Sequence, residues 1–146
     1  MYSEGNILYF TPFYFKNGHP PKPKFFIVIK AIENNTILAS LPTSIDSIPA
    51  KNEIESGCIE LADININCFV ISPKTPITEC NKHFDIPTFI YGHQLDTHDL
   101  TSLKNTYRIE FSDYEIFGKM KSEIFKELIK CLKKSKSVKQ KYLKVL

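Results

Sequence analysis

The 146-residue sequence has little glycine and contains no tract that would serve as a linker. Its 5 glycines and 9 prolines are scattered, and neither a Gly-Ser run nor a proline-rich run occurs. With 42% hydrophobic and 12% aromatic residues, the chain can bury one real core and is too short for two. A disordered tail, a collagen-like repeat and a large multidomain enzyme are therefore excluded, and we expect a single domain over residues 1–146.

The sequence also lacks the ~18 consecutive apolar residues that a membrane-spanning helix needs. Its first residues, Met1 to Gly5, lack the basic region and apolar run of a secretory signal. We therefore expect a soluble, cytoplasmic protein that has no membrane partner.

Several catalytic motifs are missing as well. No phosphate-binding Gly-x-x-x-x-Gly-Lys loop, Gly-x-Ser-x-Gly nucleophile turn or His-Glu-x-x-His pair occurs, so P-loop nucleotide hydrolysis, serine esterase chemistry and zinc proteolysis have no support. The four cysteines include no Cys-x-x-Cys pair, and we interpret them as small buried residues rather than as a disulfide framework. A zinc site is an alternative use of Cys80, His83, His93 and His98, but their spacing does not give two close pairs, and we expect no metal or other cofactor.

Arginine is nearly absent, because Arg108 is the one arginine among 19 basic residues. The net charge of +3 hides a strong asymmetry along the chain. Residues 1–118 carry 9 basic and 14 acidic side chains, a balance of −5, whereas residues 119–146 carry 10 lysines and 2 glutamates, a balance of +8. Such a tail indicates a polyanionic or acidic partner, or alternatively a helix with a solvated, lysine-rich face.

Hydrophobic patterns predict strands through most of the chain. Three runs rich in β-branched and aromatic residues lie at 6–13, 25–32 and 36–41. The polar link 33–35 predicts a tight antiparallel hairpin between the last two runs. Further strands are expected at 58–61, 64–71, 89–91 and 107–111, with one or two helical turns within 96–105.

The end of the chain is predicted to be helical. Between Ser122 and Leu132 apolar residues recur at helical spacing and form one stripe, while the lysines fall outside it. A second short helix is expected within 138–146. These elements predict an α+β, mainly β fold, in which a small antiparallel barrel at about 5–118 carries a C-terminal helical segment at 119–146.

Four short strings follow one another in a distinctive order. They are Gly-Asn-Ile-Leu-Tyr-Phe at 5–10, Pro-Lys-Phe-Phe-Ile-Val-Ile at 23–29, Ile-Leu-Ala-Ser-Leu-Pro-Thr-Ser at 37–44, and Ile-Phe-Gly-Lys-Met at 116–120 before the C-terminal helix. Their order and spacing resemble the PemK/MazF family, the small ribonuclease toxins of bacterial toxin–antitoxin pairs. The resemblance implies an SH3-like barrel with a C-terminal helix, in which residues of about 73–105 have no counterpart and would be an insertion.

The same resemblance implies a metal-independent endoribonuclease that cleaves single-stranded RNA, forms a homodimer and is inhibited by an antitoxin protein. Such cleavage needs a base for the 2′-hydroxyl, a cation at the phosphate and an acid for the leaving oxygen. Lys24 takes the place of the family's arginine, and Thr43 or Ser44 takes the place of its hydroxyl residue. Lys24 is a departure, because lysine offers a point charge where arginine holds two phosphate oxygens. Alternatively, Thr43 and Ser44 belong to a side-chain-capped turn.

The loop that precedes Lys24 gathers cations and a histidine. Lys16, His19 and Lys22 share this loop with Gly18 and several prolines, and a histidine can exchange protons near neutral pH. We therefore predict His19 as a catalytic residue, and Lys16 and Lys22 as nucleic-acid-binding residues. The alternative is an ordinary solvated surface loop.

Five of the seven residues 9–15 are aromatic, which exceeds what one face of a strand can bury. Some of these rings should be exposed near the basic loop, where bases can stack on them, and Tyr14 is the candidate. Core packing or a dimer interface would explain them equally. Arg108 is a further nucleic-acid-binding candidate if the fold brings it to the same groove. The second overall hypothesis is a non-catalytic barrel module that binds nucleic acid or a protein.

Overall fold

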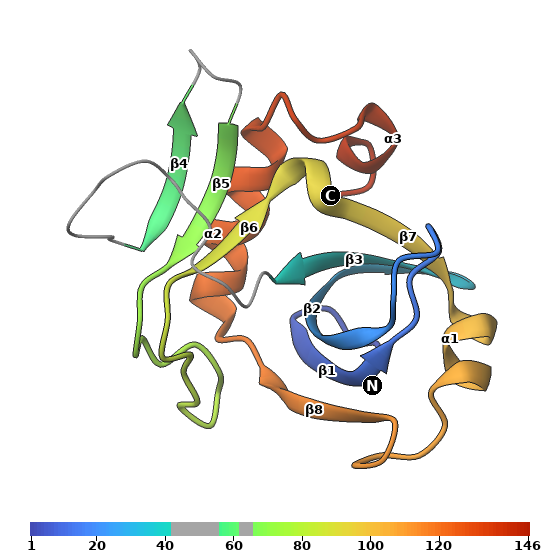
Figure 1. Cartoon of the computed structure of the whole chain (residues 1–146). Helices are drawn as coiled ribbons and strands as arrows, with labels where there is room; N and C mark the ends of the chain where they lie inside the picture. Colours follow the sequence, from blue (N-terminus) through green and yellow to red (C-terminus); the bar gives the residue numbers. More distant parts are fainter. Residues whose placement is uncertain (42–55, 62–65) are drawn as a thin grey trace.

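A computed structural model describes residues 1–41, 56–61 and 66–146 of the chain. This part of the chain forms two antiparallel sheets with short helices around them (Figure 1). In chain order the elements are β1 (Asn6–Phe13), β2 (Lys22–Ile32), β3 (Asn35–Leu41), β4 (Gly57–Leu61), β5 (Ile66–Ile71), β6 (Thr88–Tyr91), the 3₁₀ turn η2 (Gly92–Gln94), β7 (Leu95–Asp99), α1 (Leu100–Thr106), β8 (Tyr114–Lys119), α2 (Ser122–Lys134) and α3 (Gln140–Leu143).

The larger sheet has five strands in the order β7-β3-β2-β1-β8. The predicted hairpin between its second and third strands is confirmed, with Ile32 opposite Asn35. Glu33 takes the left-handed backbone conformation, with φ at 49°, although an asparagine would adopt it at less cost. Asn34 has another use, because its side-chain amide donates to Asp99 Oδ1 at 3.3 Å. The turn is thereby tied to the end of β7.

The smaller sheet has three strands in the order β4-β5-β6. The chain leaves β6 through η2 and enters β7 directly, so one continuous segment serves both sheets. Figure 1 shows this segment in yellow, crossing from the small sheet to the edge of the large one. Residues 73–105 are therefore built into both sheets rather than attached at the surface, since they supply β6, β7 and α1.

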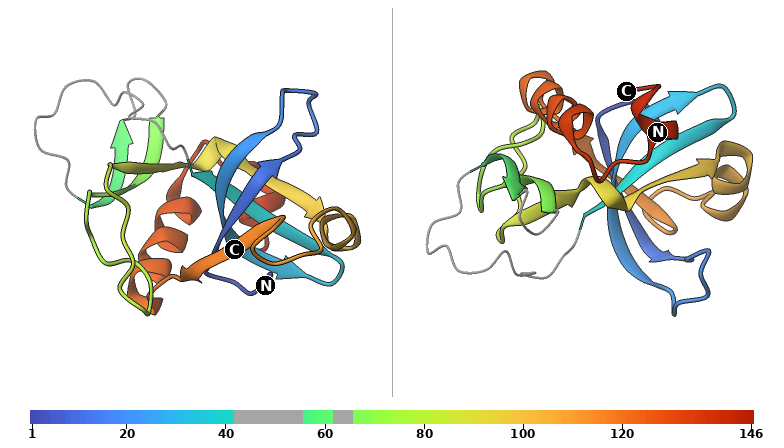
Figure 2. Two further views of the ribbon diagram at one scale, coloured as in Figure 1. Left: turned by 60° about the horizontal axis from the view of Figure 1, so that its bottom comes forward. Right: turned by 90° about the horizontal axis from the view of Figure 1, so that it is seen from above.

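The alternation of side chains along β1, β2 and β3, interrupted by register shifts between Phe10 and Phe13 and between Val28 and Lys30, divides the core into two layers. Ile7, Ile27 and Ala39 lie on the face that α2 covers, together with residues of the small sheet. Phe10 and Phe26 lie on the opposite face, where α1 and the turn after it close the second layer. Figure 2 shows α2 lying between the two sheets. Because residues of α2 pack against residues of both sheets, this helix connects the two sheets.

The helix α2 begins at Ser122 as predicted and runs two residues beyond Leu132. Leu128 and Leu132 of its apolar stripe are fully buried, while the other members of the stripe are half-buried at the margin of the core. The second helix is shorter than expected, because only Gln140–Leu143 is helical, with Tyr142 buried. The lysines of the C-terminal segment after residue 121 are exposed, as the pattern predicts.

In the segment 96–111 one prediction is confirmed in part and one was wrong. One or two helical turns were expected within 96–105, and α1 supplies them from Leu100 onward, but residues 96–99 belong to β7. Asp99 caps α1 by accepting a hydrogen bond from the Ser102 backbone N–H at 2.9 Å. Residues 107–111 were expected to form a strand, but they form a turn in which the Asp113 carboxylate accepts from the backbone N–H groups of Arg108 and Ile109. The strand β8 follows this turn.

The interpretation of the cysteines also needs correction. Cys58 of β4 and Cys131 of α2 form a disulfide across 73 positions of sequence. Cys68 is a buried thiol as expected, whereas Cys80 is an exposed one. The disulfide joins the small sheet to α2, and a pairing over such a separation leaves no local signal in the sequence.

The fold class is α+β and mainly β, with antiparallel sheets, in agreement with the prediction. Among the described residues, no helix has both the length and the apolar character to cross a membrane.

Candidate functional site

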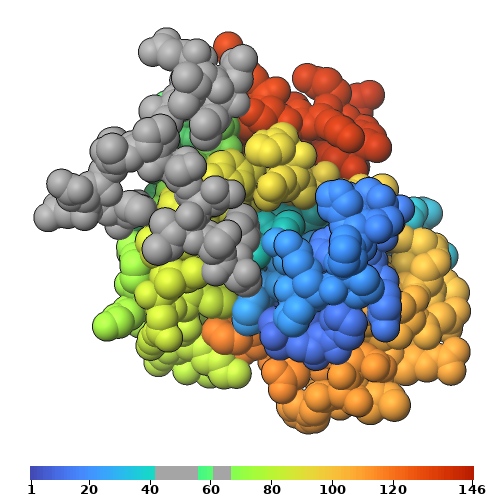
Figure 3. All heavy atoms as spheres, viewed as in Figure 1, coloured from blue at the N-terminus to red at the C-terminus, as the bar shows by residue number. Residues whose placement is uncertain are grey.

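A cavity of about 420 Å³ lies where the β1–β2 hairpin, the end of β3 and the segment from η2 to β7 meet. In Figure 3 the blue hairpin, the yellow segment and the red C-terminal segment lie beside one another on this face of the molecule. Its polar lining residues are Lys16, Asn17, Ser40, His93, Gln94, Asp96, His98 and Lys139. Its apolar lining residues are Phe13, Phe15, Phe26, Leu38 and Leu95.

Strand pairing explains why distant residues meet here. The strand β7 runs antiparallel to β3, with Leu38 opposite Asp96 and Thr36 opposite His98. Because side chains alternate along a strand, Asp96 and His98 share one face of β7, on the side where Leu38 and Phe26 lie. The register of one strand pair therefore places an acid and an imidazole against an aromatic surface.

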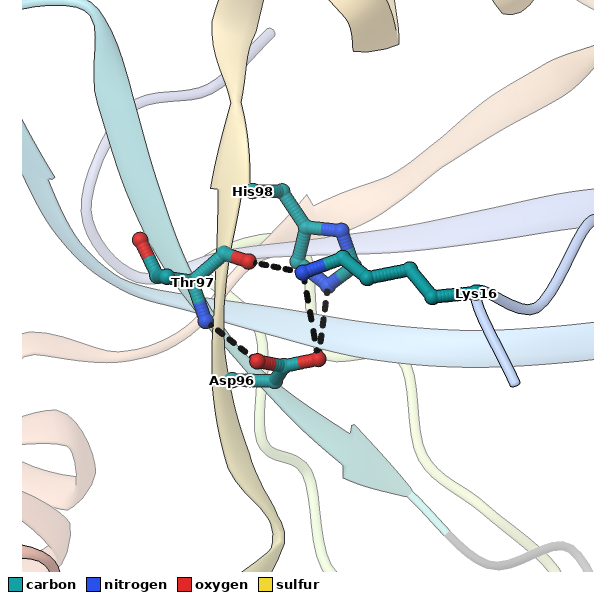
Figure 4. Close-up of polar contacts among 4 residues, drawn as sticks. All are labelled: Lys16, Asp96, Thr97 and His98. Carbon is teal, nitrogen blue, oxygen red and sulfur yellow. Dashed lines mark hydrogen bonds and ion pairs between the residues drawn. The ribbon is translucent and has the colours of Figure 1, made fainter.

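Lys16 reaches across from the hairpin to β7. Its Nζ lies 3.3 Å from Asp96 Oδ2 and donates a hydrogen bond to the Thr97 carbonyl (Figure 4). Both side chains of the ion pair are more than half exposed, so the pair contributes little to stability. Its effect is local, because it holds one ammonium group at the mouth of the cavity, close to His98.

His98 is the buried titratable group of this site, with 8% of its surface exposed. Its ring stands edge-on to the rings of Phe13 and Phe26, at centroid distances of 5.9 and 6.5 Å. Burial, helped by the charge of Lys16 and opposed by that of Asp96, lowers the pKa of His98 to about 4. The imidazole is therefore neutral at pH 7, and its 3.9 Å contact with Asp96 Oδ2 is neither an ion pair nor a hydrogen bond at that pH.

Aromatic rings form the other wall of the cavity. Phe13 packs against Phe26 at 4.5 Å and against Phe15 at 5.2 Å between ring centroids. Phe15 is only half-buried, and the Nζ of Lys22 lies 5.9 Å from its ring centroid. Planar apolar faces beside free cations are the elements that bind the bases and phosphates of single-stranded nucleic acids.

Lys24 lies next to the cavity without lining it. It is opposite Phe10 in the β1–β2 ladder and two residues before Phe26, so alternation places it on the same face of β2 as Phe26. Burial and, second, the charge of Lys22 lower the pKa of Lys24 below its ordinary value. Lys22 and Lys24 therefore lie on one face of β2, whereas Lys16 lines the cavity.

Three other candidates lie elsewhere. His19 is exposed near the tip of the hairpin, where its backbone N–H donates to Asn17 Oδ1 at 3.1 Å. Tyr14 is exposed and stacks on Tyr107 at 6.2 Å between ring centroids. Arg108 follows α1, and its Nε donates to the Asn105 carbonyl at 3.0 Å. None of the three is among the residues that line the cavity.

Thr43 and Ser44 lie outside the described residues. The hydroxyl that the described part of the chain brings to the cavity is that of Ser40, which pairs with Phe26 in the β2–β3 ladder.

The alternative of a zinc site gains no support. Cys80 contacts the Thr78 hydroxyl at 3.2 Å, and His83 contacts Asp85 at 3.4 Å. Within residues 1–41, 56–61 and 66–146, no group of three or more His, Cys, Asp or Glu side chains is placed to hold a metal ion.

Sequence reasoning missed Asp96, His93, His98 and Lys139 as residues of this site. The alternation of Leu95 and Thr97 with Asp96 and His98 was the available signal, but polar residues before an apolar run also resemble the start of a helix. Lys139 had no signal, because it lies 41 positions beyond His98 in the sequence and reaches the cavity only through the fold.

Comparisons of the chain with protein-family models, with curated proteins and with solved structures find no match.

Proposed function

We propose that the protein binds single-stranded RNA at this cavity and cleaves it without a metal ion, as the toxin of a toxin–antitoxin pair. The observation that carries the proposal is the cavity itself, which brings a neutral imidazole, a second histidine and two lysines against aromatic rings. With it we propose the finer architecture that the resemblance implies, an SH3-like barrel, together with a homodimer and an antitoxin protein as partners.

The cavity offers a group for each role in RNA cleavage. His98, neutral at pH 7, would take the proton of the 2′-hydroxyl as that oxygen attacks phosphorus. His93, at the exposed side of the same cavity, would give a proton to the departing 5′ oxygen, leaving a cyclic phosphate on one product. Lys16 and Lys139 would stabilise the charge that develops on the phosphate.

The residues that the resemblance singles out keep a supporting role in this proposal. Lys24 and Lys22 lie beside the cavity and would hold a neighbouring phosphate. Thr43 and Ser44 follow Ser40, a lining residue of the cavity, by three and four positions in the sequence. His19 would act only if the tip of the hairpin approached the bound strand.

One observation favours the second candidate function, a non-catalytic module that binds nucleic acid. Lys16 is already engaged by Asp96 and Thr97, and Arg108, the single arginine of the chain, is held at the Asn105 carbonyl. The lining of the cavity therefore offers no guanidinium fork for the phosphate. Binding without cleavage would follow if this loss is not compensated.

The test is incubation of the purified protein with a labelled single-stranded RNA in EDTA. We expect cleavage, a loss of about 100-fold or more in the His98→Gln variant, and a smaller loss in Lys16→Gln. His83→Gln, an exposed histidine outside the cavity, is the matched control and should cleave like the wild type. RNA that is bound but stays intact would select the non-catalytic module, and RNA that is neither bound nor cut would refute both functions.

A further inference from the structure

The lysine-rich end of the chain reaches the candidate site. We call residues 133–144 the C-terminal basic segment; it carries six lysines and no acidic residue. All six lysines are exposed. One of them, Lys139, lines the cavity together with Lys16 and His98. The basic tail is thus continuous with the site rather than separate from it.

The C-terminal basic segment packs against the rest of the protein through buried residues. Ser135, Val138 and Tyr142 are buried, so the segment contacts the domain between its lysines. Its contact with η2 is so close that a Cβ atom at Gly92 would lie 2.8 Å from both Ser135 Oγ and Val138 Cγ2. Since His93 follows Gly92 and lines the cavity, the segment is held at a fixed place beside it. Figure 1 shows α3 above β7 and β3.

Within the described structure no lysine of the segment forms an ion pair, although Lys141 Nζ lies 5.1 Å from the centroid of the Tyr142 ring. The ion pair that involves a C-terminal lysine in the described residues joins Lys130 to Glu127, one turn before the segment begins. Six ammonium groups without acidic partners in the described chain repel one another, and a polyanion would relieve that repulsion.

We propose that an RNA strand bound in the cavity continues onto the C-terminal basic segment, whose lysines bind successive phosphates outside the point of cleavage. This inference rests on the proposed function and extends it, because it makes the substrate a strand longer than the cavity. The cavity of 420 Å³ is at the small end of the range of about 300–1,000 Å³ for ligand sites, so a longer strand must leave it.

The chemistry of the segment favours nucleic acid over an acidic protein. Of its large apolar residues, Val138 and Tyr142 are buried and Leu143 is half-buried, and the exposed surface of the segment presents ammonium groups. The centre of a protein–protein interface is depleted in lysine and rich in aromatic residues, whereas a phosphate backbone needs little more than cations.

The experiment measures binding of 2′-O-methyl RNA, which lacks the free 2′-hydroxyl that cleavage needs, by fluorescence anisotropy. Oligonucleotides of about 5 and about 20 nucleotides are compared between about 50 mM and about 200 mM salt. The test variant is the triple change Lys136→Gln, Lys141→Gln, Lys144→Gln, which leaves the lining of the cavity intact. The matched control removes the same charge from the end of β8 and the first half of α2, with Lys119→Gln, Lys121→Gln, Lys126→Gln.

We expect the test variant to bind the long strand about 10-fold or more weakly than the wild type, with the slope of log K against log salt reduced by about 2. The short strand should bind the wild type and the test variant alike, and the control should lose much less affinity for the long strand. Far-UV circular dichroism and thermal unfolding check that both variants fold.

Three outcomes would overturn the inference. They are an equal loss in the test and control variants, a loss that does not depend on strand length, and competition by polyglutamate as effective as competition by RNA at equal charge. The last outcome would identify an acidic protein as the partner of the segment. If the expected binding is measured but RNA stays intact in EDTA, RNA binding by the C-terminal basic segment would stand and the proposed cleavage would be refuted. The failure of this inference and the failure of the proposed function are therefore distinguishable.

Discussion

Burial of His98 should make the protein sensitive to mild acid. The pKa of His98 is about 4 in the folded chain, against an ordinary value of 6.5. Between these two values the unfolded chain binds more protons than the folded chain, so the free energy of unfolding falls as the pH drops from about 6.5 towards 4. Above this window the contribution is constant, because the imidazole is neutral in both states.

The magnitude follows from the difference of about 2.5 between the two pKa values. At roughly 1.36 kcal/mol per pKa unit, His98 removes about 3 kcal/mol of stability when the pH falls through this window. A domain of this size is stabilised by only about 5–15 kcal/mol, so a single side chain would account for a large part of its acid lability.

The assay is urea unfolding followed by far-UV circular dichroism, from about pH 7 to about pH 4. Wild type and His98→Gln should lose different amounts of stability over this range, with the variant losing about 3 kcal/mol less. His19→Gln removes an exposed histidine of the hairpin and should follow the wild type. Parallel curves for wild type and His98→Gln would refute the reasoning, since they would mean that His98 titrates alike in the folded and unfolded chains.

Two further predictions concern the connections of the C-terminal helices. Cys58→Ser removes the disulfide to Cys131, which closes a loop of 73 residues, and should lower the free energy of unfolding by up to about 4 kcal/mol. Urea titrations without reductant measure this loss, and Cys80→Ser, which changes a free thiol, should cause none. Equal stability of the two variants would contradict the pairing of Cys58 with Cys131. Gly92→Ala places a Cβ atom against Ser135 and Val138 and should lower the free energy of unfolding, measured by thermal unfolding, by about 1–3 kcal/mol. Adding Val138→Ala should restore part of that stability, because it removes one of the two close contacts. Additive losses in the double variant would show that the close contact is not the cause.

The sequence predicts the first three strands and α2 well, because each carries its own periodic signal. In β1, β2 and β3 alternate residues enter two different core layers, and in α2 the stripe that includes Leu128 and Leu132 lies on one face. These signals are local, so neighbouring residues suffice to identify them. The basic hairpin with Lys16, Lys22 and Lys24 could be identified for the same reason.

The strand β7 could not be identified in this way, since its residues favour a helix start and only pairing with β3 makes them a strand. The position of His98 in the site therefore depends on the tertiary pairing of β7 with β3. The position of Lys139 likewise depends on the packing of Val138 and Tyr142. The partner of Cys58 was hidden in the same manner. In each case the missing information is a contact between residues far apart in the chain, and local propensity carries none of it.

The direct passage from β6 through η2 into β7 couples the shape of the cavity to the angle between the two sheets. The turn η2 has only three residues, and two of them, His93 and Gln94, line the cavity. Any rotation of the three-stranded sheet against the five-stranded one must be absorbed within those residues, since hydrogen-bonded strands on either side are stiff. The disulfide and α2 limit that rotation from the far side of the small sheet. The cavity therefore lies at the connection between the two sheets, and a rotation of the small sheet would displace His93, one of its lining residues.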